Sequence, residues 1–179
     1  MHAHLQLVRD FHEQAGVKQP GYQQTAHLAD MDIIMHQSLL MGGGCETFKA
    51  IVAGDATKNL AGLVNLAYHA LAAIACRGDD LAAASVVWRH EGSVLSVMRE
   101  LSGKIDDCSS GESIHYSALY HLCDSVVCGF LNADFDRAFR IVHQSLMEYA
   151  IKRAAQSYGR RIAQESLPVA PDLNEAFYE

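Results

Sequence analysis

Proline is scarce in this sequence, and so are charged residues. Only 3 of the 179 residues are proline and 20% are charged, whereas 50% are hydrophobic. Disordered chains show the opposite balance, with many charges and few apolar residues, so we expect a folded protein. The length suits one domain or two very small ones. Long stretches that are rich in alanine and free of proline favour an all-α fold.

Positive charge is also in short supply. The chain has 14 Lys and Arg residues against 21 Asp and Glu, which gives a formal net charge of −7. A protein that binds nucleic acid through its phosphates needs a basic face. The one local basic run, from Lys152 to Arg161, is more typical of a solvated helix surface. We therefore expect no nucleic-acid partner.

Cysteine pairs with metal or redox spacing are missing. The chain has an odd number of cysteines and no Cys-x-x-Cys motif: Cys45, Cys76, Cys108, Cys123 and Cys128. Their mostly apolar neighbours are typical of reduced core cysteines in a cytosolic protein. We recognise no signal peptide at the start and no apolar segment long enough to span a bilayer. The expected location is cytoplasmic, without a membrane partner.

Apolar residues recur every three or four positions, which predicts a series of helices. The first covers about residues 5–15 and ends at Gly16, because glycine favours the left-handed C-cap conformation. The second begins at Asp30 or Asp32 as its cap. Its apolar face consists of Ile34, Ser38, Met41, Cys45, Phe48 and Val52.

Three consecutive glycines, Gly42 to Gly44, lie inside this second helix, but the apolar residues keep their helical spacing across them. Each costs about 1 kcal/mol relative to alanine, so either tertiary packing holds the helix or it kinks there.

A third helix follows a turn at residues 53–56 and is capped by Asp55 or Thr57. Its apolar stripe consists of Leu60, Leu63, Val64, Ala67, Leu71 and Ile74, and Gly78 ends it. Asp79 or Asp80 is expected to cap a further helix, from Leu81 to about residue 89 or beyond.

The second half of the chain repeats this order of elements. One stripe consists of Val94, Met98, Leu101 and Ile105, and another of Leu119, Leu122, Val126 and Phe130, with a turn at 106–112 between them. Asp134 or Asp136 caps a last long helix, to about residue 159. A constant offset then places Glu46 on Glu100 and Gly78 on Asn132. We expect one all-α domain, residues 1–160, with related hairpins in tandem at about 31–90 and 93–150. A C-terminal tail, 161–179, follows, extended or disordered from residue 168.

Four segments in a fixed order carry a family resemblance: VRDFHE at 8–13, FKAIVAGD at 48–55, LVNLAY at 63–68 and DFDRAFRIVHQS at 134–145. Together they resemble the all-α nucleoside-triphosphate pyrophosphohydrolases, a superfamily that includes the MazG-like proteins and phosphoribosyl-ATP pyrophosphohydrolase. The resemblance covers most of residues 5–150. It implies a MazG-like helical bundle, with four helices around one core, and a nucleotide as the ligand. The family's dimers and the many surface apolar residues favour a homodimer or higher homo-oligomer.

The chemistry of this family rests on a Glu-Glu-x-x-Glu motif and a Glu-x-x-Asp motif, whose carboxylates hold Mg²⁺ against the triphosphate. In this chain the first motif falls on residues 42–46 and the second on 62–65, so that Glu46 alone keeps a carboxylate. Asn65 replaces the aspartate and offers a neutral oxygen. By this resemblance Glu46 is the candidate catalytic residue, and Glu46 and Asn65 are the candidate metal ligands. Glu100 is the counterpart of Glu46 in the second half. One carboxylate and one amide are a poor set for Mg²⁺, so we expect lost or altered catalysis, with Mg²⁺ as cofactor only if the protein is active.

Further candidate ligand-binding residues are histidines and their neighbours. By analogy with the family's first helix, His12 borders the nucleotide pocket, although an ordinary surface position is the alternative. His121 and Asp124 share a helix face and could bind a ligand together, or they form a plain polar pair at an interface. The glycine triplet lacks the Gly-x-x-x-x-Gly-Lys pattern of a phosphate loop, so close approach of another helix or a loosened helix is the better explanation, with lost function as a further alternative. Three functions stay open: a MazG-like pyrophosphohydrolase, a non-catalytic binder of a nucleotide or another small ligand, and a structural homo-oligomeric protein.

Overall fold

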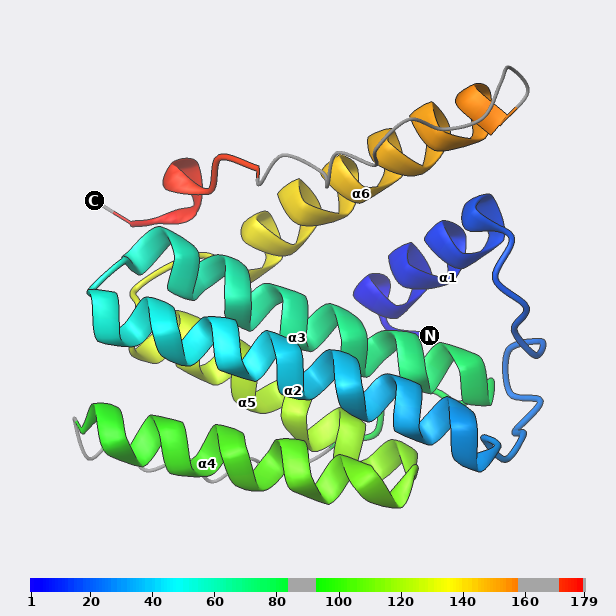
Figure 1. The fold of residues 1–179 in the computed structure, drawn as a ribbon, viewed down its shortest axis with the longest axis horizontal. Coiled ribbons are helices and arrows are strands. Elements are labelled where there is room, and N and C mark those ends of the chain that lie inside the picture. Colours follow the sequence, from blue (N-terminus) through cyan, green and yellow to red (C-terminus); the bar gives the residue numbers. More distant parts are fainter. Residues whose placement is uncertain (84–92, 158–170, 179) are drawn as a thin grey trace.

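The computed structural model describes residues 1–83, 93–157 and 171–178, and this part of the chain is all-helical, as expected (Figure 1). Its α-helices are α1 (Ala3–Ala15), α2 (Asp30–Ala53), α3 (Ala56–Arg77), α4 (Val94–Asp107), α5 (Ser113–Gly129) and α6 (Phe135–Ser157). Two short 3₁₀ turns, η1 (Cys108–Ser110) and η2 (Asn174–Ala176), complete the elements. The helix expected from Leu81 to about residue 89 falls mostly outside the described residues, and residues 81–83 are not helical.

The ends of the helices follow the expected local rules, with one exception. Gly16, Gly54 and Gly78 close α1, α2 and α3 with φ of 71°, 68° and 74°, the left-handed conformation that glycine adopts without strain. Asp55 caps α3 by accepting a hydrogen bond of 2.9 Å from the Lys58 amide. The predicted aspartate cap of α2 is wrong, because Ala29 is its N-cap residue. Asp30 and Asp32 lie in the first turn instead, where they still offset the helix dipole.

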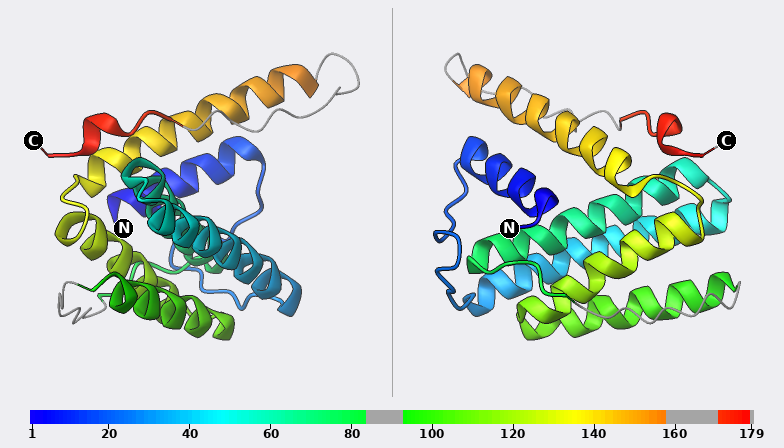
Figure 2. Two further views of the ribbon diagram at one scale, coloured as in Figure 1. Left: turned by 60° about the vertical axis from the view of Figure 1, so that its left-hand side comes forward. Right: turned by 180° about the vertical axis from the view of Figure 1, so that it is seen from behind.

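The core is built around α3. Every residue of its predicted stripe is fully buried: Leu60, Leu63, Val64, Ala67, Leu71 and Ile74. α3 packs between α2 and α5, and α4 contacts both α2 and α5, so the two hairpins form one four-helix bundle (Figure 1). α1 and α6 contact each other and cover another side of α3 (Figure 2). A shared core of this kind makes the two hairpins parts of one unit.

The equivalent ends of the two hairpins have the same backbone conformation. Gly78 follows α3 with φ of 74°, and Asn132 follows α5 with φ of 52°. Positive φ is uncommon outside glycine, and asparagine is among the residues that tolerate it best. Gly78 directly follows α3, whereas Asn132 lies three residues after the end of α5, so the correspondence of the two hairpins stays a prediction.

α3 is also the helix whose length and composition would allow it to cross a membrane, and it is the one such helix among the described residues. The expectation that the sequence holds no such segment is therefore wrong by that measure. However, 72% of the most apolar 18-residue stretch of α3 is buried inside the bundle, as in the core helix of a soluble protein. In this fold its apolarity serves packing against α2 and α5.

α2 turns a different side to the bundle than its sequence predicts. Its buried residues are His36, Leu40, Gly44, Thr47 and Ala50. Three members of the predicted apolar face, Ile34, Met41 and Val52, are instead 58%, 61% and 83% exposed. The reason is that small and polar residues on the inner side allow α3 to come close, which larger apolar residues would prevent. The helix continues without interruption through the three glycines.

The end of the chain is docked, unlike the extended or disordered tail that we expected. Residues Leu173 and Ala176 are buried, and Phe177 forms an isolated bridge with Ala133. The Asp134 amide donates a hydrogen bond of 2.7 Å to the Ala176 carbonyl. The Tyr178 amide also donates to the Asn132 carbonyl at 3.1 Å, so residues 171–178 pack against the segment that joins α5 to α6.

Candidate functional site

The residues expected to hold Mg²⁺ lie on the outer surface of the helices. Glu46 on α2 is exposed, and its Oε1 atom is 2.7 Å from Nζ of Lys49 on the same helix. Asn65 on α3 and Glu100 on α4 are exposed as well. Within the described ranges no three His, Cys, Asp or Glu side chains converge as a metal-binding group. One carboxylate that is already paired with an ammonium group, together with an amide, does not fit the oxygen-rich shell of Mg²⁺.

Three glycines of this hairpin, Gly43, Gly44 and Gly62, lie at close contacts between helices. A Cβ on Gly62 would lie 2.3 Å from Oγ1 and 3.1 Å from Cα of Thr47. A Cβ on Gly43 would lie 3.2 Å from Leu66, and one on Gly44 would lie 2.8 Å from Ile105. Close approach of neighbouring helices, the explanation that the sequence favoured for the triplet, is therefore confirmed at Gly43 and Gly44. Gly42 differs from them, because a Cβ there would meet no atom within 4 Å.

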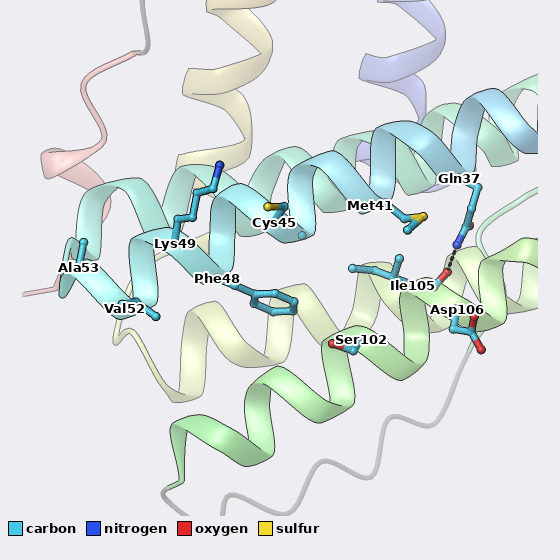
Figure 3. A pocket seen from close by; sticks show the side chains of 11 residues that line it. Gln37, Met41, Cys45, Phe48, Lys49, Val52, Ala53, Ser102, Ile105 and Asp106 are labelled. Atoms are coloured by element: carbon cyan, nitrogen blue, oxygen red, sulfur yellow. Dashed lines mark hydrogen bonds between the residues drawn. The ribbon is translucent and has the colours of Figure 1, made fainter.

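An apolar groove of about 660 Å³ runs between α2 and α4, beside this glycine segment (Figure 3). Met41 and Phe48 of α2 reach toward α4, and Ile105 faces them from the other side (Figure 3). At one end Gln37 donates a hydrogen bond of 2.8 Å from Nε2 to the Ile105 carbonyl, which ties the two helices together. The remaining lining residues are Gly44, Cys45, Lys49, Val52, Ala53, Ser102 and Asp106. Because Gly44 has no side chain, the Ile105 side chain packs directly against α2 and forms part of the groove.

The groove is poorly equipped to hold a triphosphate. Lys49 is the one basic residue among those that line it, and its ammonium group is bound to Glu46. Asp106 adds a carboxylate from α4, on the other side of the groove. Polyphosphate sites use several cations, metal ions or convergent backbone amides to balance the charge. None of Glu46, Asn65 and Gly62 lines the groove, so the predicted metal positions and this groove are separate places.

A second pocket, of about 360 Å³, lies where the start of α1 meets α5 and α6. Its central residue is His4, which is 4% exposed. The Nδ1 atom of His4 is 2.7 Å from the Tyr120 hydroxyl, and the Nε2 atom is 2.8 Å from Oδ1 of Asp136. Burial lowers the pKa of His4, although the hydrogen bond to Asp136 opposes this, so the ring is neutral at pH 7. The neutral ring then donates from Nε2 to Asp136 and accepts at Nδ1 from Tyr120.

Two of the predicted ligand-binding residues lie near this pocket. Asp124 lines it and accepts a hydrogen bond from Cys128, whose sulfur is 3.4 Å away. His121 is bound elsewhere, with Nε2 3.0 Å from the Ala82 carbonyl. The pair therefore does not act on one common partner in this structure. Contacts of residues more than 100 positions apart, as between His4 and Tyr120, leave no mark in the spacing of a sequence, which is why His4 was missed.

His12 lies on the buried side of α1 rather than on the rim of a groove. It is 5% exposed, and its Nδ1 atom is 3.3 Å from Oε1 of Gln19. Burial lowers its pKa, so it is a neutral residue of the interior. It lines neither of the two pockets described above.

The cysteines are all free, but they are not all core residues. Cys108 and Cys123 are buried, and burial raises the pKa of both thiols. Cys45 and Cys128 are exposed, contrary to the expectation for most of the set. Cys45 is of interest because it lines the α2–α4 groove.

Comparisons with protein-family models, curated proteins and solved structures find no match to this chain.

Proposed function

We propose that this protein is a non-catalytic member of the MazG-like all-α superfamily, and that its α2–α4 groove binds an elongated apolar ligand. The observation that carries the proposal is the apolar lining of the groove, formed by Met41, Phe48 and Ile105. The ordered motifs and the four-helix bundle formed by two hairpins support the family assignment. The lost carboxylates support the absence of catalysis.

The shape of the groove favours a chain-like or flat ligand. Its lining residues on α2 extend from Gln37 to Ala53. At 1.5 Å per residue this is a length of about 24 Å, too long for a compact polar metabolite to fill. Apolar lining with a few polar groups at the edge is typical of sites for hydrophobic ligands. A nucleotide is the less suitable ligand, because Lys49 is the one cation available and is already paired.

The binding test uses a neutral fluorescent probe, N-phenyl-1-naphthylamine, and a variant that fills the groove. Ser102 lies exposed in the groove wall, so Ser102→Trp should weaken probe binding at least tenfold. Ser109→Trp is the matched control, because Ser109 is exposed on η1 and does not line the groove. Equal binding by the wild type and Ser102→Trp would contradict the proposed site.

The catalytic test measures pyrophosphate release from the common ribo- and deoxyribonucleoside triphosphates, with Mg²⁺ and with Mn²⁺. We expect no release above the rate without protein, because no group of three metal ligands is found among residues 1–83, 93–157 and 171–178. Turnover that disappears in Glu46→Ala would refute the loss of catalysis. A thermal shift with a nucleotide, without turnover, would keep the non-catalytic assignment but replace the apolar ligand by a nucleotide.

A further inference from the structure

The second pocket, which lies between the start of α1, α5 and α6, has three carboxylates in its walls. Asp124 belongs to α5, Asp136 lies in the first turn of α6, and Asp134 directly precedes α6. Among the described residues that line this pocket there is no Lys or Arg. Its two histidines, His2 and His4, are neutral at pH 7, because burial lowers the pKa of both. The described walls therefore carry negative charge without a positive charge among them.

Two of these carboxylates form no ion pair in the described part of the chain. Asp136 is the exception, because its Oδ2 atom is 2.8 Å from Nε of Arg140. Asp124 accepts a hydrogen bond through Oδ1 from the thiol of Cys128. Asp134 uses Oδ1 to cap α6, where it accepts a hydrogen bond of 3.0 Å from a backbone amide of the first turn. Both Asp124 and Asp134 are half-buried, and Oδ2 of each has no partner among the described residues.

The Tyr120 hydroxyl is a further acceptor in the same pocket. Tyr120 lines the pocket and is only 2% exposed. Its proton is donated to Nδ1 of His4, and the Nε2 proton of His4 is donated to Asp136. The phenolic oxygen is therefore left with its lone pairs, and no described residue donates to it. Because a buried acceptor without a donor is costly, this oxygen indicates a place for a ligand that donates hydrogen bonds.

Aromatic rings form the rest of the pocket wall. The rings of Tyr120 and Phe135 lie 5.6 Å apart with an interplanar angle of 73°. The His2 ring meets Tyr120 in a similar way, at 5.5 Å and 74°. Tyr178 also lines the pocket and is 56% exposed, so it lies at the mouth. Ring faces beside carboxylates attract an organic cation, and their apolar surface suits the methylene groups that join its charges.

We propose that this pocket binds an aliphatic polyamine, with two of its ammonium groups on Asp124 and Asp134 and its methylene chain against the aromatic rings. Two carboxylates on different elements suit a ligand whose positive charges are separated. The volume of about 360 Å³ suits a short chain, because small-molecule sites cover a range of about 300–1,000 Å³. A metal ion fits less well, since no three metal-binding side chains converge within the described ranges. The pocket shares no lining residue with the α2–α4 groove, so this site does not depend on the ligand of the groove.

The first test measures spermidine binding to the full chain by isothermal titration calorimetry, in about 0.15 M salt, where exposed charges are screened beyond about 8 Å. The wild type should bind spermidine at a single site. Asp124→Asn and Asp134→Asn should each weaken binding at least tenfold, as expected for the loss of a charge-assisted hydrogen bond. Asparagine is as good an N-cap as aspartate, so Asp134→Asn preserves the start of α6. Asp55→Asn is the matched control, because Asp55 is also an N-cap aspartate but does not line the pocket.

The outcomes of this titration separate a built site from a general attraction between opposite charges. A wild type that does not bind spermidine would overturn the proposal, and so would an equal loss of affinity in Asp55→Asn. The number of ammonium groups is tested with 1,4-diaminobutane and butylamine, which have the same carbon chain. The diamine should bind at least tenfold more tightly, and equal binding of the two would refute the pairing with two carboxylates.

The second test places the ligand by protection of Cys128, whose exposed thiol lines the pocket and contacts Asp124. Spermidine should slow the alkylation of Cys128 by N-ethylmaleimide at least fivefold, measured by peptide mass spectrometry. Cys45 is the internal control, because it is also exposed but lines the α2–α4 groove. Unchanged alkylation of Cys128, or equal slowing at both thiols, would contradict binding in this pocket. Ser102→Trp should bind spermidine like the wild type, and loss of binding in that variant would place the amine in the groove instead.

Discussion

The contact between Gly62 and Thr47 allows a sharp test of how closely α2 and α3 pack. In Gly62→Ala the new methyl group would lie 2.3 Å from Oγ1 and 3.1 Å from Cα of Thr47. The Thr47 hydroxyl could rotate away, but it would then lose its hydrogen bond of 2.8 Å to the Gly43 carbonyl. The Cα atom belongs to the backbone and cannot move alone. The two helices must therefore separate to accommodate a single methyl group.

Three terms determine the expected change in the free energy of unfolding. Overpacking of a close contact costs about 1–3 kcal/mol. Loss of the Thr47 hydrogen bond costs about 1 kcal/mol more. Alanine recovers about 1 kcal/mol of helix propensity relative to glycine. We expect Gly62→Ala to lose about 1–3 kcal/mol, which lowers the melting temperature by about 2–12 °C for a domain of this size.

The measurement is urea and thermal unfolding of three matched variants at one protein concentration. Gly42→Ala and Gly103→Ala are the controls, because a Cβ at either position meets no atom within 4 Å. They should gain up to about 1 kcal/mol from helix propensity alone. If Gly62→Ala is as stable as these two, the close contact of α2 with α3 does not exist, and the account of the glycine at this position fails.

Three other expectations concern buried polar groups. His4→Phe keeps the shape of the ring but leaves the Tyr120 hydroxyl without its partner and takes one of two partners from Asp136, which keeps Arg140, so thermal unfolding should show a loss of about 1–3 kcal/mol. Arg77→Met removes a buried guanidinium that donates to a backbone carbonyl at 2.8 Å and to two carboxylates, and denaturant unfolding should show a loss of about 3 kcal/mol. Burial lowers the pKa of His69 in the folded protein to about 4, below its ordinary value of 6.5. Between pH 4 and pH 6.5 the unfolded chain therefore binds a proton that the folded chain does not bind. Stability is therefore complete above pH 6.5 and falls by at most about 3 kcal/mol toward pH 4, a change that urea unfolding should record and that His69→Gln should reduce.

The sequence predicts α3 well and α2 poorly, and the difference has a physical cause. α3 lies at the centre of the bundle, so an apolar stripe on it can only be buried. α2 lies at the edge, and its periodic apolar residues, such as Ile34 and Met41, face outward or line the groove. Periodicity identifies an apolar face but does not say whether the same chain or another molecule covers it. The inner face of α2 was missed because its contacts with α3 depend on Thr47 and on glycines, which do not count as apolar residues.

Contacts that join distant parts of the chain were beyond the reach of the sequence. His4 binds Tyr120 and Asp136, which lie on two different helices near the other end of the chain. The docking of residues 171–178 rests on single backbone hydrogen bonds and on two buried residues, Leu173 and Ala176. Neither arrangement has a period or a spacing from which it could be predicted. The helix ends could be predicted, because a glycine or aspartate acts within one turn of its own position.

On the proposed relationship to the MazG-like proteins, loss of the metal site and tight packing of the first hairpin are connected. A glutamate at position 62 needs the space that Thr47 now fills, and a side chain at position 43 needs the space of Leu66. Restoring Glu at 42, 43 and 62 and Asp at 65 would therefore separate α2 from α3 before it produced a magnesium site. Simple reversal of the four residues is expected to yield an unstable protein rather than an active one. A smaller residue in place of Thr47 would relieve the clash at position 62, but positions 42, 46 and 65 are exposed, so their carboxylates would still not lie between the two helices.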